Sequence, residues 1–200
     1  MRGAGVLGTK TLGVVLVAFC LGGLFSLAAC GPGGRQEVSL DDLEGQAHSP
    51  LALSEAKANV VIFITNDCPI ANSYAPEIQS IISDYSPRGA AFFLVHVDPD
   101  LTLEKAKKHA AEYGYECVIL RDPGQRLVRE LEAQVAPEAF VLTGKGVAYR
   151  GRIDDLFADL GKKRRQARNR DLRNALDSVF SGKPVSNSRT EAVGCFIPEL

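Results

Sequence analysis

The sequence predicts an α/β domain in which helices cover both faces of a sheet, and three observations indicate it. The run Val60–Ile64 is continuously apolar and rich in β-branched residues, which is typical of a strand buried on both faces. Ile78, Ile81 and Ile82 then recur at helical spacing within 74–85. Further strands and helices alternate along the chain, and this alternation favours a sheet with helices on both sides.

The other elements are predicted from apolar runs and from the residues that end them. Residues 91–97 form a second buried strand, and 101–113 form a helix with Thr102 as N-cap and Gly114 as its stop. The later elements are a strand over 117–120, a helix over 125–132, strands over 139–142 and 147–150 joined by a glycine-containing turn, and a helix over 171–180.

The first thirty residues have the layout of an export signal. Arg2 and Lys10 supply positive charge, an apolar stretch follows over 12–27, and small residues precede Cys30. The run Leu-Ala-Ala-Cys that ends there resembles the bacterial lipoprotein signal, in which the cysteine is lipidated. An uncleaved membrane helix is the alternative, although three glycines interrupt the short apolar stretch.

This interpretation divides the chain into four parts. Residues 1–29 are the signal peptide, and 30–37 are a flexible linker after the lipidated cysteine. A folded domain spans 38–182, and 183–200 form a C-terminal tail with Cys195. We therefore expect an exported lipoprotein, anchored by its lipid to a membrane of the cell envelope and facing the periplasm or the cell exterior.

Charge excludes nucleic acid as the main partner. The 200 residues carry 23 Lys and Arg against 24 Asp and Glu, a net charge of −1, whereas phosphate binding needs a basic excess. The densest basic run, 162–170, is predicted to be a solvated loop. Nearby carboxylates are expected to neutralise it, namely Asp154, Asp155, Asp159 and Asp171.

The cysteines indicate redox chemistry. Cys20 leaves with the signal and Cys30 takes the lipid, so Cys68, Cys117 and Cys195 remain in an oxidising compartment. Cys68 stands between the buried strand and a helix that begins at a proline. Backbone N–H groups and the dipole at a helix N-terminus favour thiolate over thiol, so we expect an accessible, reactive sulfur there. Cys117 opens a short apolar strand and is predicted to be a core residue.

Three proline positions give the domain a family resemblance. The pair Cys68-Pro69 between a strand and a helix, Pro76 within the helix, and Ala136-Pro137 before a strand resemble the thioredoxin superfamily. The wider run 68–78 is most similar to its redoxin branch, related to alkyl hydroperoxide reductase and thiol-specific antioxidant proteins. The resemblance implies a thioredoxin-like fold with a central mixed sheet, and a cis-proline loop at Pro137 that shapes the substrate groove.

Departures from the family bear on the reaction. Ala71 stands where thioredoxins carry their second cysteine, which excludes a local Cys-x-x-Cys disulfide. Thr65 matches the threonine of peroxiredoxins, but Val61 replaces their proline. Their pocket arginine has no assured equivalent; the candidates are Arg121, Arg150 and Arg152.

The resemblance implies a thiol–disulfide oxidoreductase or thiol-dependent peroxidase without cofactor or metal. Cys68 attacks a protein disulfide or a peroxide, and Cys195, or else Cys117 or an external thiol reductant, resolves the product. The alternative is a non-enzymatic Cu(I)-binding or adaptor lipoprotein, in which His96 joins Cys68 and Cys195. His48 and His109 are expected at the surface.

Overall fold

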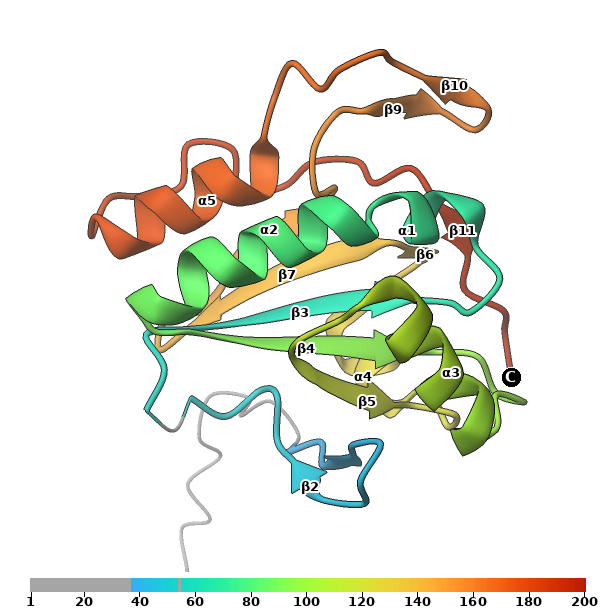
Figure 1. Ribbon diagram of the computed structural model, residues 1–200. Helices are drawn as coiled ribbons and strands as arrows, with labels where there is room; N and C mark the ends of the chain where they lie inside the picture. Colours follow the sequence, from blue (N-terminus) through green and yellow to red (C-terminus); the bar gives the residue numbers. More distant parts are fainter. Residues whose placement is uncertain (1–36, 54) are drawn as a thin grey trace, which may run out of the picture. The chain divides into compact units, whose positions relative to one another are not determined.

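The computed structural model describes residues 37–53 and 55–200, so the predicted signal peptide, Cys30 and most of the linker lie outside the described residues. Within the described residues, no helix is both long and apolar enough to span a bilayer. The central sheet has the order β5-β4-β3-β7-β8 (Figure 1). Its strands are β3 (Ala58–Ile64), β4 (Ala90–His96), β5 (Val118–Arg121), β7 (Glu138–Thr143) and β8 (Gly146–Gly151).

The sheet is mixed, and helices cover both of its faces. β3, β4 and β5 run parallel, whereas β7 is antiparallel to β3 and to β8. Side chains of α2 and α5 pack on one face, and those of α4 pack on the other. The predicted fold class is therefore confirmed. The helices are α1 (Pro69–Ser73), α2 (Ala75–Tyr85), the 3-10 helix η1 (Ser86–Arg88), α3 (Leu103–Tyr113), α4 (Arg126–Leu131) and α5 (Asp171–Phe180).

The strand β3 is the centre of the core. All seven of its residues are buried, and alternate side chains belong to the two cores on opposite faces of the sheet. Its pairing sets the position of the functional edge. Ile64 is level with His96 of β4, and Phe63 is level with Glu138 of β7. The chain that leads to Cys68, the end of β4 and the start of β7 therefore lie at one edge of the sheet.

The helix predicted over 74–85 begins earlier and is divided in two. It starts at Pro69 and breaks at Tyr74, whose N–H donates to the carbonyls of Ile70 and Ala71. Pro76 has no N–H and cannot continue the ladder of hydrogen bonds, which explains the break. The predicted ends of the next helix are confirmed, because Thr102 caps α3 and Gly114 terminates it in the left-handed conformation.

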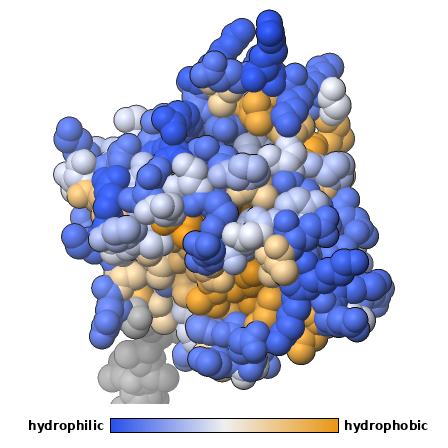
Figure 2. Space-filling model, in the orientation of Figure 1, coloured by the Kyte–Doolittle hydropathy of each residue, from blue (hydrophilic) through white to orange (hydrophobic). Residues whose placement is uncertain are grey.

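Short strands that the sequence did not predict arrange the loops around the sheet. They are β1 (Leu40–Asp41), β2 (Ala47–His48), β6 (Val135–Ala136), β9 (Phe157–Asp159), β10 (Lys162–Lys163) and β11 (Cys195–Phe196). β11 belongs to the C-terminal tail and pairs antiparallel with β6, which Figure 1 places beside α1. The face seen in Figure 2 is mostly hydrophilic, with apolar residues gathered in small patches.

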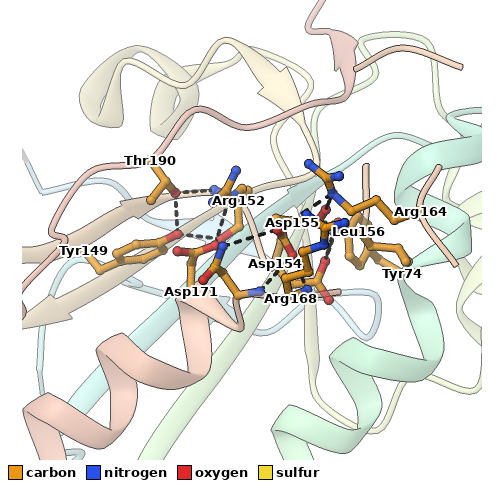
Figure 3. A network of polar contacts seen from close by, with 11 residues as sticks. Tyr74, Tyr149, Arg152, Asp154, Asp155, Leu156, Arg164, Arg168, Asp171 and Thr190 are labelled. Carbon is orange, nitrogen blue, oxygen red and sulfur yellow. Dashed lines mark hydrogen bonds and ion pairs between the residues drawn. The ribbon is translucent and has the colours of Figure 1, made fainter. Parts of the chain in front are cut away.

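The basic run 162–170 is exposed or half-buried, as predicted, although its first two residues form β10 instead of a loop. The carboxylate of Asp155 accepts the N–H groups of Arg168 and Asn169 at 2.6 and 2.8 Å, and its carbonyl accepts Arg164 Nε at 2.9 Å. Figure 3 shows this network around the loop after β8. Asp159 also pairs with the run, whereas Asp154 and Asp171 bond to Tyr74 and Arg152 instead.

Candidate active site

Cys68 caps the helix α1 at the carboxyl end of β3. Its sulfur accepts the N–H of Ala71 at 3.4 Å, and its thiol donates to the carbonyl oxygen of Ala136 at 3.2 Å. Pro69 occupies the first helical position, where a missing N–H costs nothing. The prediction that the sulfur is accessible is wrong, because Cys68 is 2% exposed. The carbonyl of Ala136 in the cis-proline loop contacts its thiol, and the tail pairs with the same residue.

The cis-proline loop lies directly beside this sulfur. The Ala136–Pro137 peptide bond is cis, as the resemblance implies, and Pro137 is buried between β6 and β7. Ala136 contacts Cys68 through its carbonyl oxygen and is also the strand partner of Cys195. One residue of the loop therefore connects the two cysteines.

The tail approaches the loop so closely that Gly194 has no room for a side chain. A Cβ at this position would lie 2.2 Å from the carbonyl oxygen of Ala136 and 3.0 Å from the nitrogen of Pro137. Glycine before Cys195 thus allows the tail to bring its thiol onto the cis-proline loop.

Cys195 and Cys68 are both free thiols on either side of the cis-proline loop: Cys195 is the strand partner of Ala136, and the carbonyl of Ala136 accepts the Cys68 thiol. Burial, together with the neighbouring Cys68, raises the pKa of Cys195 to about 12. Cys195 therefore stays protonated at neutral pH.

Cys117 behaves as the predicted core residue. It precedes β5 and packs against the core on the α2 side of the sheet. Burial raises the pKa of its thiol to about 12, so it is inert at neutral pH. The structure thus brings Cys195, and not Cys117, to Cys68.

A buried network that the sequence did not reveal supports the loop before Cys68. His109 was expected at the surface but is 4% exposed, and its Nε2 lies 2.9 Å from Asn72 Oδ1. Asn72 donates in turn to the carbonyl of Asn66 at 3.0 Å. The N–H of Asn66 donates to the carboxylate of Asp98 at 2.9 Å, which links this loop to the end of β4.

The imidazole in this network is neutral at pH 7. Burial, together with the charge of His96, lowers the pKa of His109 to about 4. The rings of His96 and His109 meet edge to face with centroids 4.9 Å apart. The periodicity of α3 gives a signal for this burial, because Ala106, Ala110 and Tyr113 mark the same helix face as His109.

His96 does not complete a metal site with the cysteines. It is 1% exposed, and its Nδ1 lies 3.7 Å from the carboxylate of Asp98. Within the described residues, no three His, Cys, Asp or Glu side chains are grouped so that they would hold a metal ion. The described geometry therefore gives no support to the Cu(I)-binding alternative.

The peroxidase candidates lie in other contacts. Thr65 is buried at the end of β3, three residues before Cys68. Arg121 donates to the carbonyl of Leu101. Arg150 pairs with Glu138 at 2.9 Å, and Arg152 pairs with Asp171 at 2.7 Å. Each of these guanidinium groups thus has a partner other than the Cys68 sulfur.

Comparisons with known proteins agree with the geometry. The model of the AhpC/TSA family matches residues 33–152, which is more than half of the chain. A hypothetical protein from Sinorhizobium meliloti superimposes with a TM-score of 0.72 at 27% identity, over 82% of this chain and 91% of that one. No curated protein matches the chain.

More distant solved structures show the same fold. A secreted disulfide oxidoreductase from Mycobacterium tuberculosis, homologous to E. coli DsbE, has a TM-score of 0.53 at 14% identity, covering 71% of this chain and 96% of that one. A thioredoxin-like protein from Aeropyrum pernix has a TM-score of 0.52 at 16% identity, covering 73% and 89%. These likenesses confirm the predicted thioredoxin-like fold, and the match to the AhpC/TSA family confirms the predicted redoxin branch.

Proposed function

Because the chain belongs to the AhpC/TSA family and is therefore a thiol-dependent redox enzyme, we propose that it exchanges disulfides with protein substrates through Cys68 and Cys195. Cys68 is the nucleophile and Cys195 is the resolving thiol. The observation that carries this proposal is that Ala136 of the cis-proline loop accepts the Cys68 thiol at 3.2 Å and is also the strand partner of Cys195.

The reaction balances with these two residues and one substrate disulfide. The Cys68 thiolate attacks one sulfur of the substrate, forms a mixed disulfide and releases the other sulfur as a thiolate that takes up a proton. Cys195 then gives up its proton and attacks the Cys68 sulfur, which releases the second substrate thiol. The substrate gains two electrons and the Cys68–Cys195 pair loses two. An external dithiol reductant restores the pair, and the steps reverse when the substrate is a dithiol.

Disulfide exchange is favoured over peroxide reduction by the polar contacts of the site. In peroxide reduction, charged donors assist departure of hydroxide from the sulfur-bound oxygen. The candidate donors Arg121, Arg150 and Arg152 have partners elsewhere. The neighbour that Cys68 does have is a thiol, which is the group that resolution of a mixed disulfide needs.

Disulfide mapping by mass spectrometry tests the roles of the cysteines. After mild oxidation of the purified protein, we expect a Cys68–Cys195 link and an unmodified Cys117. Cys195→Ser should accumulate mixed disulfides at Cys68, and Cys68→Ser should lose exchange activity. Cys117→Ser is the matched control and should behave as the parent does. A link to Cys117, or a Cys68 that stays unmodified, would overturn the proposal.

The cell-envelope location is a second part of the proposal. It is supported by the signal-like residues 1–29 and by the small residues before Cys30. A lipid on Cys30 would tether the redox domain to a membrane surface while the domain itself stays in water. In a bacterial host, the parent should be found in the membrane fraction after high-salt washing. Recovery of the parent in the soluble fraction would contradict the anchor.

A further inference from the structure

The tail of this chain lies on the cis-proline loop as an added strand. Cys195 is level with Ala136, and Phe196 is level with Val135. The N–H of Ile197 then donates to the carbonyl of Gln134 at 2.9 Å, which continues the pairing by one residue. A second protein segment that placed its cysteine against Cys68 in this way would use the same backbone groups.

The site requires glycine on one side of the cysteine and is open on the other. A Cβ on Gly194 would lie 2.2 Å from the carbonyl oxygen and 2.5 Å from the carbonyl carbon of Ala136. Both are backbone atoms of a buried loop, which cannot turn away as a side chain can. Phe196, by contrast, is 79% exposed, so the residue after the cysteine meets little restriction.

A hollow of about 440 Å³ lies beside the loop and offers room for the rest of such a segment. Part of its lining lies outside 194–197: Gln134 and Val135 of the loop, the 56% exposed Leu160, and charged side chains such as Glu138 and Arg150. These residues stay in place when 194–197 leave the loop.

The tail and a substrate cannot occupy the loop together. Cys68 is 2% exposed with the tail in place, so a protein disulfide reaches the sulfur only after the tail has moved. The hydrogen bonds that hold 195–200 are the pairing with β6, the bond of Ile197 to Gln134, and one from Gln125 Nε2 to the carbonyl of Pro198. Cys195 and Ile197 also pack, partly buried, against the core, so the tail is held by one two-residue strand and two side chains.

From these observations, and building on the proposed function, we propose that the tail is a substrate mimic in cis, and that the preferred substrates are extended protein segments with glycine immediately before the reactive cysteine. The substrate displaces 194–197 and pairs with β6 in their place. Once Cys68 holds the substrate in a mixed disulfide, the substrate segment leaves β6 while it stays linked to Cys68. The returning tail then delivers Cys195 to the Cys68 sulfur and expels the substrate thiol.

Activated peptides test the preference for glycine. Full-length Cys195→Ser protein is mixed with extended peptides that differ only in Gly, Ala or Val before a cysteine carrying a thionitrobenzoate disulfide. Attack by Cys68 joins it to the peptide cysteine and releases coloured thionitrobenzoate. We expect the Gly-Cys peptide to react about tenfold faster than the Val-Cys peptide, since the added side chain meets a fixed backbone.

Two further variants test the competition by the tail. In the Cys195→Ser background, Gly194→Val pushes the tail off the loop, and Ile197→Pro removes the N–H that bonds to Gln134. Each should speed the reaction of the Gly-Cys peptide several-fold. Glu199→Ala, at an exposed tail position beyond the paired residues, is the control and should leave the rate near that of its parent.

Ellman's reagent separates the two levels of the proposal, because it reports the reactivity of Cys68 without a peptide. If Cys68 reacts with it, equal rates for the three peptides and unchanged rates in both tail variants would overturn the inference and leave the proposed function standing. A Cys68 that reacts with neither the reagent nor any peptide would overturn both.

Discussion

The two sides of the Cys68 site are held in different ways. On the α1 side, partly buried hydrogen bonds join Asn72 to His109 and to the loop before Cys68. On the tail side, a two-residue strand brings Cys195 into place, and its neighbour Phe196 is largely exposed. Cys68 is therefore built into the core, whereas Cys195 lies on a segment that is held by short-range pairing.

Oxidation is expected to have the largest effect, because it joins the two sides covalently. A Cys68–Cys195 disulfide closes a loop of more than a hundred residues, which in the chain-entropy model stabilises an unstrained protein by about 4–5 kcal/mol. Chemical unfolding of the oxidised and reduced forms measures this difference. Cys195→Ser should abolish it, whereas Cys117→Ser should keep it. Equal free energies of unfolding for the oxidised and reduced forms would contradict a stabilising Cys68–Cys195 disulfide.

Asn72→Ala should have the next largest effect, because it disrupts the α1 side. The change removes the acceptor of His109 Nε2 and a donor to Asn66, and it leaves buried groups unpaired. We expect the free energy of unfolding to fall by about 2–4 kcal/mol. Ser73→Ala, at the next position, is the control. It removes only an exposed contact with Lys163 and should change the free energy of unfolding by less than about 0.5 kcal/mol.

The fold and the place of Cys68 at a helix start could be predicted from local sequence, but the surroundings of Cys68 could not. The apolar run at Val60–Ile64 and the Cys68-Pro69 pair indicate the strand, the helix start and the reactive position within a few neighbouring residues. The burial of Cys68 depends on a tail more than a hundred residues later in the chain. Two-residue strands such as β6 and β11 are too short to leave a periodic pattern.

Acid should weaken the α1 side through His109. Burial and the charge of His96 lower its pKa to about 4, below the ordinary value for histidine, so the unfolded chain binds this proton more readily. The stabilising effect of the neutral ring is complete above about pH 6.5 and is lost as the pH falls toward 4. Asp98, Asn72 and Tyr113 also face the ring.

Unfolding measured at pH 7 and pH 4.5 checks this effect. The parent should lose on the order of 2–3 kcal/mol more than His109→Gln over this range, because glutamine keeps a donor for Asn72 but does not titrate. The difference between variant and parent in this loss separates the effect of His109 from that of the carboxylates, which titrate in both proteins. If both proteins lose the same free energy, His109 is not the acid-sensitive group on this side.

Thr190→Val should have the smallest effect on global stability, because it acts at the base of the tail. Figure 3 shows the Thr190 hydroxyl between Tyr149 and Arg152; it lies 2.6 Å from the Tyr149 hydroxyl and accepts the N–H of Arg152 at 3.1 Å. Valine has the same shape without these bonds, so we expect a loss of about 1–2 kcal/mol in unfolding free energy. Ser188→Ala, which keeps the backbone carbonyl bonded to Arg150, is the control.

The rate of Cys68 alkylation by a small reagent then decides whether the tail opens separately from the domain. If the tail moves alone, loosening its base exposes the sulfur without unfolding the sheet, because local opening has its own, lower free energy. Thr190→Val should therefore speed alkylation of Cys68 under native conditions. Asn72→Ala should give a smaller gain in alkylation rate for each kcal/mol of unfolding free energy that it loses. Alkylation that follows global stability equally in both variants would mean that the two sides open together.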